Sequence, residues 1–212
     1  HGAAKGVELA GELELTQHAV DSVGGLADIL EQQNRVAGVD GVGGPLKGRD
    51  HGQIAAGQAS LGRGETSYSG AAGIPALREA LSAHYTAEYG IDIAPSRIMI
   101  TPGASGALLL ISALLVNPGE GMLMTDPGYP CNRHFLRLVE GEGHLVAVGA
   151  DTRYQLNEAL VEQHWRDNTI GVLVASPANP TGAVLSRDEL QGLSRAVRAR
   201  KGHLVVDEIY HG

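Results

Sequence analysis

The sequence contains one cysteine, few aromatic residues and no long hydrophobic run. Because Cys131 is the only cysteine among 212 residues, no intrachain disulfide can form, and we expect a protein of the reducing cytoplasm. The longest apolar stretch, residues 107–116, is shorter than the roughly 18 residues that a membrane-spanning helix requires. The amino end does not resemble a signal peptide. These observations favour a soluble intracellular protein without a membrane partner.

Positive charge is scarce as well. Sixteen Lys and Arg residues against 24 Asp and Glu residues give a net charge of -8, so the composition provides no electrostatic reason to bind nucleic acid. The nine histidines show no metal-ligand spacing, and we expect no metal site. A small anion held at one focused position remains compatible with this composition.

From residue 74 onward, short apolar runs alternate with helical patterns, which is typical of an α/β fold with a mostly parallel sheet. We predict helices over residues 75–89, 104–116, 129–140 and 157–167 and after the Ser186 cap, and strands over residues 97–101, 122–125, 145–148, 171–175 and 204–206. Residues 1–52 differ, with scattered glycines and only a partial helical pattern near residues 26–30. We therefore separate residues 1–52 from a domain over residues 53–212.

Residues 101–107 (TPGASGA) end a predicted strand and open a predicted helix. The free N–H groups of a first helical turn and the positive end of its dipole favour a phosphate. The small residues keep the approach open, and the Ser105 hydroxyl can donate a hydrogen bond. A plain strand-to-helix turn would have the same sequence, and the motif is neither a Walker loop nor a dinucleotide fingerprint.

Two further motifs follow predicted buried strands. Asp207 comes directly after residues 204–206, and a carboxylate at the carboxyl end of a parallel strand points into the crevice where open sheets bind ligands. It could stabilise a buried cation there, such as a protonated pyridine nitrogen, with a helix cap or a solvated turn as the alternative. Asn179 offers an amide donor from a proline-stiffened loop, and an ordinary Asn-Pro turn is the competing account.

The order and spacing of six motifs carry more information than any one of them. They are residues 68–70 (YSG), 73–78 (GIPALR), 101–107 (TPGASGA), 126–130 (DPGYP), 179–182 (NPTG) and 207–210 (DEIY). In this order they resemble the class I and II aminotransferases of fold type I, which depend on pyridoxal phosphate. The resemblance implies part of the large domain, a three-layer α/β sandwich. It also implies a homodimer that transfers an amino group between an L-amino acid and a 2-oxo acid.

The resemblance assigns roles around the cofactor. Gly103, Ala104 and Ser105 are similar to the cradle of the cofactor phosphate. Tyr129 is similar to the aromatic residue that stacks on the pyridine ring, and a surface tyrosine in a Pro-Gly turn is the alternative. These assignments place the phosphate at the helix terminus that the first motif already indicates.

Four more residues receive roles from the resemblance. Asn179 and Tyr210 are similar to the pair that hydrogen-bonds the phenolic oxygen of the cofactor, and Asp207 is similar to the carboxylate that keeps the pyridine nitrogen protonated. Tyr68 is similar to the tyrosine that reaches across a dimer interface to the partner's cofactor phosphate. The interpretation requires Ser105 and Asp207 to lie at the same edge of the sheet.

The sequence departs from the family in its lysines. Transamination needs a Schiff-base lysine, which in the family lies a few dozen residues beyond the position of Asp207. Lys5, Lys47 and Lys201 do not correspond to it, and the sequence ends at Gly212. We therefore assign no catalytic residue, and we expect a fragment or a truncated product that is inactive alone.

Two other functions remain open at this stage. One is a non-catalytic module that binds pyridoxal phosphate or regulates another protein, although no helix-turn-helix pattern is visible. The other is a lyase or decarboxylase that uses the same cofactor, because a fold-level resemblance does not fix the reaction.

Overall fold

The computed structural model describes residues 50–210 of the chain. The helices are α2 Asp50–Gly62, α3 Pro75–Tyr89, α4 Gly103–Leu115, α5 Cys131–Leu138, α6 Glu158–His164 and α7 Arg187–Ala199, with 3-10 turns η1 Pro95–Arg97 and η2 Ala150–Thr152. The strands are β1 Gly121–Asp126, β2 Glu142–Ala147, β3 Thr169–Ala175 and β4 His203–Asp207. The pattern near residues 26–30 lies outside the described residues.

The four strands form one parallel sheet in the order β2-β1-β3-β4. Each connection between consecutive strands contains a helix, because parallel neighbours need a crossover. In register, Ala175 at the end of β3 pairs with Asp207 at the end of β4. The carboxyl ends of β1, β3 and β4 therefore open onto one edge of the sheet.

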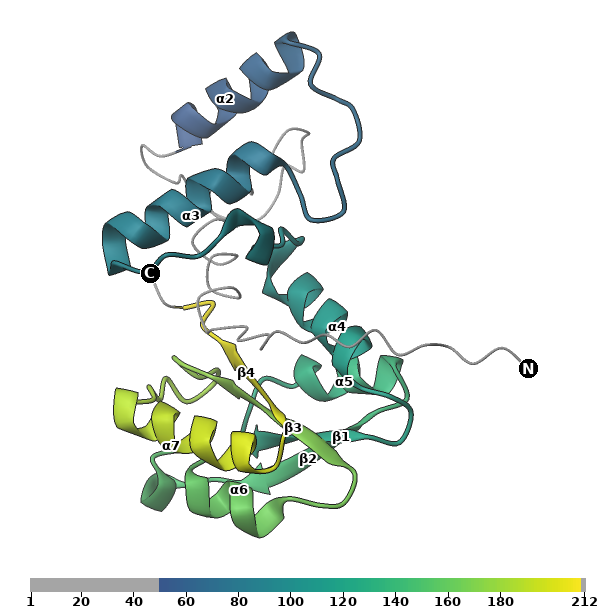
Figure 1. Cartoon of the computed structure of the whole chain (residues 1–212), viewed down its shortest axis with the longest axis vertical. Coiled ribbons are helices and arrows are strands. Elements are labelled where there is room, and N and C mark those ends of the chain that lie inside the picture. The colour runs from purple at the N-terminus through teal and green to yellow at the C-terminus, as the bar shows by residue number, and fades with distance from the viewer. Residues whose placement is uncertain (1–49, 211–212) are drawn as a thin grey trace, which may run out of the picture.

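Side chains of the strands alternate between two buried layers. Val172 and Val174 of β3 pack with Leu193 of α7, whereas Leu173 between them packs with Leu108 of α4. Both faces of a sheet with crossover helices are buried, which explains why the strands read as continuous apolar runs. Figure 1 shows α6 and α7 on one side of the sheet and α4 and α5 on the other. The three-layer α/β sandwich is confirmed.

A smaller cluster lies under α3. Leu81 and Tyr85 of α3 pack with Ile93 and Ile98, which flank η1. In Figure 1, α2 and α3 lie away from the sheet. Gly90 ends α3 in the left-handed conformation, as expected from the sequence.

Most predicted elements are present within a few residues of their expected bounds, but one strand is wrong. Residues 98–101 are extended without forming a ladder, and the segment begins with the 3-10 turn η1. Its backbone bonds to a residue distant in sequence through Ile100 N, which donates to Ala72 O at 3.1 Å. Among residues 50–210 no strand lies beside it, so the β-favouring sequence has no partner to pair with. Helix α2 was not expected from the sequence.

Within the described part of the chain, no helix combines the length and the apolar character needed to cross a membrane.

Candidate cofactor site

The candidate site lies where β1, β3 and β4 end and α4 begins. Val205 of β4 packs in the layer of α4 and α5, and Asp207, two residues later, lies on the same face of the pleated strand. The amide of Ser176 donates to the Asp207 carbonyl at 2.9 Å, which ties the loop after β3 to the end of β4. These strand ends carry three of the motifs found in the sequence.

Asn179 and Tyr210 meet across two different loops. Asn179 lies in the loop after β3 and Tyr210 follows β4, 31 residues later in sequence. The Asn179 Nδ2 donates to the Tyr210 hydroxyl at 3.3 Å. The structure thus brings together the pair that the motifs 179–182 and 207–210 single out.

Tyr129 projects from a tight turn after β1. A Cβ at Gly128 would lie 2.5 Å from the Thr125 carbonyl oxygen, so only glycine fits the preceding position. A hydrogen bond with Cys131 is the main cause that raises the pKa of the half-buried Tyr129, whereas a hydrogen bond with Ser105 lowers it. Tyr210 adds a smaller effect in the raising direction.

Groups of α4, α5 and the segment after β4 thus contribute to the pKa shift of Tyr129. We name Ser105, Tyr129, Asn179 and Tyr210 the strand-end cluster. Its members are polar and come from the start of α4 and from the segments that follow β1, β3 and β4. Tyr210 follows Asp207 by three residues, so the Asn179–Tyr210 pair lies at the carboxyl end of β4. That Ser105 lies at the same edge as Asp207 stays a prediction.

Asp207 is buried and forms no ion pair with any residue in the part of the chain that the structure describes. Its residue is 6% exposed, and its Oδ1 accepts one hydrogen bond, from Ile209 N at 3.1 Å. Burial raises the pKa of Asp207, and the bond from the Ile209 amide acts in the opposite direction. Since an unpaired buried carboxylate is costly, a cationic ligand beside it would be favoured.

The amino end of α4 is open to an anion. Gly103 begins the helix with φ +73°, and a Cβ built there would meet no atom within 4 Å. Pro102, at the cap position, makes no side-chain hydrogen bond to the helix. The Gly103 N–H donates to the Thr101 carbonyl at 2.8 Å, so the first-turn N–H groups of Ala104 and Ser105 are the ones that an anion could meet.

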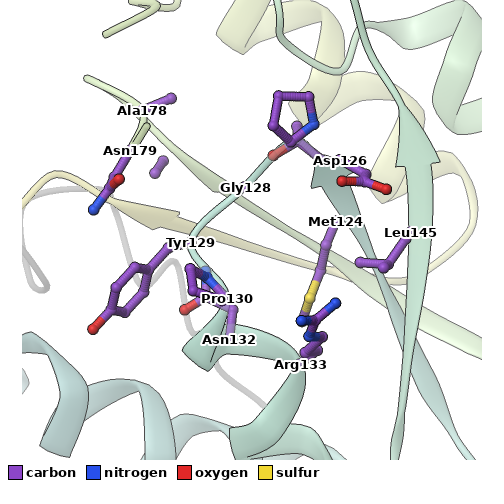
Figure 2. A pocket seen from close by; sticks show the side chains of 13 residues that line it. Met124, Asp126, Gly128, Tyr129, Pro130, Asn132, Arg133, Leu145, Ala178 and Asn179 are labelled. Carbon is purple, nitrogen blue, oxygen red and sulfur yellow. The ribbon is translucent and has the colours of Figure 1, made fainter. Parts of the chain in front are cut away.

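A pocket of about 180 Å³ adjoins the cluster. Figure 2 shows Tyr129 and Asn179 on one side of it and Asp126 and Arg133 on the other. The pocket reaches only part of the strand-end cluster, because Ser105 and Tyr210 do not line it.

The family model for aminotransferase class I and II matches residues 46–212. The chain belongs to this family. Its fold is that of the fold type I aminotransferases. Class I and II aminotransferases use pyridoxal phosphate as cofactor.

Several relatives are similar over most of the described residues. The chain is 37% identical over 171 residues to a valine–pyruvate aminotransferase of Mycobacterium tuberculosis, covering 80% of this chain and 44% of that protein. It is 31% identical to an aspartate aminotransferase of Sulfolobus acidocaldarius, covering 71% and 38%. The chain spans less than half the length of these relatives.

Solved structures agree with this assignment. An aminotransferase from Mycobacterium tuberculosis superposes with a TM-score of 0.71 at 38% identity, covering 75% of this chain and 43% of that one. The Thermus thermophilus aspartate aminotransferase with maleate gives a TM-score of 0.70 at 29% identity, covering 90% and 50%.

Tyr68 and Lys201 lie apart from the strand-end cluster. Tyr68, in the segment between α2 and α3, is fully exposed and contacts no member of the strand-end cluster in the structure. Lys201 precedes β4 and so lies at the amino end of the sheet, opposite the candidate site, as expected. Lys5 and Lys47 lie outside the described residues.

Two buried polar residues near the site were not singled out by the sequence. Gln155 is 3% exposed and binds the backbone at the base of the Asn179 loop. Glu208 is 4% exposed beside Asp207. Nothing in a single sequence distinguishes Gln155 from a surface glutamine, because its partners are backbone carbonyls of distant residues.

Proposed function

We propose that this chain forms the pyridoxal-phosphate-binding part of an aminotransferase that moves an amino group between an L-amino acid and a 2-oxo acid. The observation that carries the proposal is the buried Asp207 carboxylate, which has no cationic partner among the described residues and ends the strand beside the strand-end cluster. A protonated pyridine nitrogen supplies the missing positive charge.

The other end of the cofactor fits the start of α4. A phosphate there would accept hydrogen bonds from the first-turn N–H groups and from the Ser105 hydroxyl, while Gly103 leaves the approach unobstructed. The helix dipole favours the dianion. Asp207 and the helix terminus thus match the cationic and anionic ends of one small heteroaromatic molecule.

The ring between these ends has partners of suitable chemistry. The Tyr129 ring offers an aromatic face for stacking. The Asn179 amide and the Tyr210 hydroxyl, already 3.3 Å apart, would bind the phenolic oxygen between them. When bound, the cofactor supplies an electron sink for the electrons released at the substrate α-carbon. Asp207 strengthens that sink by holding the proton on the ring nitrogen.

The whole reaction needs residues beyond this set. We propose that the fully exposed Tyr68 belongs to a dimer interface, where it would reach the partner's cofactor phosphate. Amino-group transfer is favoured over a lyase reaction or a non-catalytic module, because the relatives carry aminotransferase names.

Titration of the purified chain with pyridoxal phosphate tests the proposal. Binding is followed by absorbance, and borohydride reduction with peptide mapping identifies cofactor attached to surface lysines. Asp207→Asn should weaken non-covalent binding by at least about tenfold, because it removes a charge-assisted hydrogen bond. The matched control Asp167→Asn, an exposed residue at the amino end of β3, should bind like the unmodified chain.

A second comparison tests the phosphate end. Pyridoxal, which lacks the phosphate, should bind much more weakly than pyridoxal phosphate. Equal affinities of the two compounds, or equal affinities of the Asp207→Asn and Asp167→Asn variants, would contradict the proposed function.

A further inference from the structure

The loop that carries Asn179 is held at both ends by one side chain. Gln155 Nε2 donates to the carbonyl of Ala175, at the end of β3, at 2.8 Å and to the carbonyl of Ala183, where the chain returns, at 3.1 Å. Two carbonyl oxygens require the amide nitrogen and not the oxygen, so the orientation of the Gln155 amide is fixed. The side chain therefore joins two backbone positions eight residues apart.

One hydrogen bond within the loop shares its acceptor with Gln155. Ala178 N donates to the same Ala183 carbonyl at 2.9 Å, and Gly182 N donates to the Ala178 carbonyl at 2.7 Å. Ser176 Oγ accepts a bond from Leu185 N at 2.9 Å just outside the loop. Asn179 lies between these bonded positions. Its place relative to Tyr210 is consequently set by how the two ends of the loop are held.

Gln155 itself comes from a rigid part of the fold. It follows η2, and its backbone N–H donates to the Thr152 carbonyl at 3.2 Å. The next residue, Leu156, is 1% exposed in the core. Its own Oε1 is buried without a partner. Burying Oε1 without a partner destabilises the fold, so the stabilising contribution of the Gln155 side-chain amide comes from the two bonds that its Nε2 donates.

We propose that Gln155 is a positioning residue that sets the loop so that the Asn179 amide lies against Tyr210. This inference rests on the proposed function, in which that pair binds the phenolic oxygen of the cofactor. Gln155 does not touch the cofactor in this scheme, and its effect on binding passes through Asn179.

Hydrogen exchange of the cofactor-free chain tests the structural half of the proposal. Gln155→Met keeps a side chain of similar length but removes both donors. Amide exchange over residues 176–183 should become at least about tenfold faster, because two buried bonds to the loop base are lost. The control Asn168→Ala removes a comparable amide-to-carbonyl bond, to Gly119 O at 2.8 Å, at the amino end of the sheet. It should leave exchange in the loop unchanged.

A double-mutant cycle tests the route to the cofactor. Gln155→Met should weaken binding of pyridoxal phosphate several-fold in the unmodified chain but have no further effect in an Asn179→Ala background. A variant that merely loosened the fold would weaken binding by the same factor in both backgrounds. Circular dichroism confirms that each variant is folded. Should Gln155→Met fail to fold, Gln155→Leu replaces it in both experiments, because leucine is apolar, smaller than glutamine and lacks donors in any protonation state.

The outcomes separate the two proposals. Unchanged exchange over residues 176–183, or additive effects in the cycle, would overturn the role of Gln155 and leave the proposed function standing. Absence of binding by the unmodified chain would overturn the proposed function, and the role of Gln155 with it. Faster exchange together with a non-additive cycle would establish Gln155 as a positioning residue.

Discussion

Replacing Glu208 by glutamine should change how the stability of the fold depends on pH. Glu208 is 4% exposed, and its Oε2 has no hydrogen-bond partner. Burial alone raises the pKa of Glu208 from 4.5 to about 8, and no charged neighbour contributes. The folded protein therefore keeps a proton on this carboxyl that the unfolded chain releases at much lower pH.

The sign and the size of the effect follow from this difference. Between the two pKa values the folded state binds more protons than the unfolded state, so the free energy of unfolding decreases as the pH rises. The contribution is fully present below the unfolded pKa and is lost as the pH passes through the folded one. At about 1.4 kcal/mol per pH unit, the loss between about pH 5 and about pH 8 is at most about 4 kcal/mol.

Urea unfolding at a series of pH values measures this loss. Glu208→Gln cannot titrate, so the difference in unfolding free energy between the variant and the unmodified chain should grow in favour of the variant from about pH 5 to about pH 8. All other titrating groups are common to both proteins and cancel. The exposed Glu162→Gln serves as control. A constant difference between Glu208→Gln and the unmodified chain across this range would refute the reasoning.

Two further predictions concern the scaffold. Ser186→Ala should destabilise the fold by about 1 kcal/mol in urea unfolding, because it removes the capping box in which Ser186 Oγ accepts from Glu189 N at 3.3 Å. Burial chiefly, and then Arg166, lower the pKa of His144, whose Nδ1 lies 2.8 Å from Thr169 Oγ1. The unfolded chain therefore takes up a proton here more readily than the folded protein, so the free energy of unfolding should decrease as the pH falls below about 6.5. His144→Gln should remove this pH dependence. An NMR titration should give a pKa of His144 below about 6.5.

Local sequence patterns predicted the helix ends correctly where the residues that fix an end lie within the same segment. The Pro75 start and Gly90 end of α3, and the Ser186 cap of α7, are encoded by residues within one turn of the helix ends. Residues 98–101 show the opposite case, because a strand requires a partner that local sequence does not specify. The apolar, β-branched residues there favour an extended backbone, which is what the structure contains, without a ladder.

The candidate site shows the same division between local and distant information. The motifs predict which residues bear the chemistry, and the parallel topology places the ends of the strands that precede three of these motifs at one edge of the sheet. The sequence did not predict that Gln155 binds both ends of the Asn179 loop. Its partners are the backbone carbonyls of Ala175 and Ala183, and every residue has a carbonyl. Backbone-directed contacts leave no compositional signal at their partners.

Asp207 and Glu208 are neighbours in sequence and both are buried, and burial raises the pKa of each. In the proposed site, only Asp207 of these two contacts the cofactor. A cofactor that arrives with its ring nitrogen already protonated stabilises the ionised form of Asp207 and lowers its pKa, so binding of that form should release the Asp207 proton to solvent wherever Asp207 is protonated in the free chain. Glu208 gains no such partner and keeps its proton until the pH approaches about 8. Calorimetry of cofactor binding in two buffers of different ionisation enthalpy therefore separates them: Asp207→Asn should abolish this proton release, whereas Glu208→Gln should leave it intact.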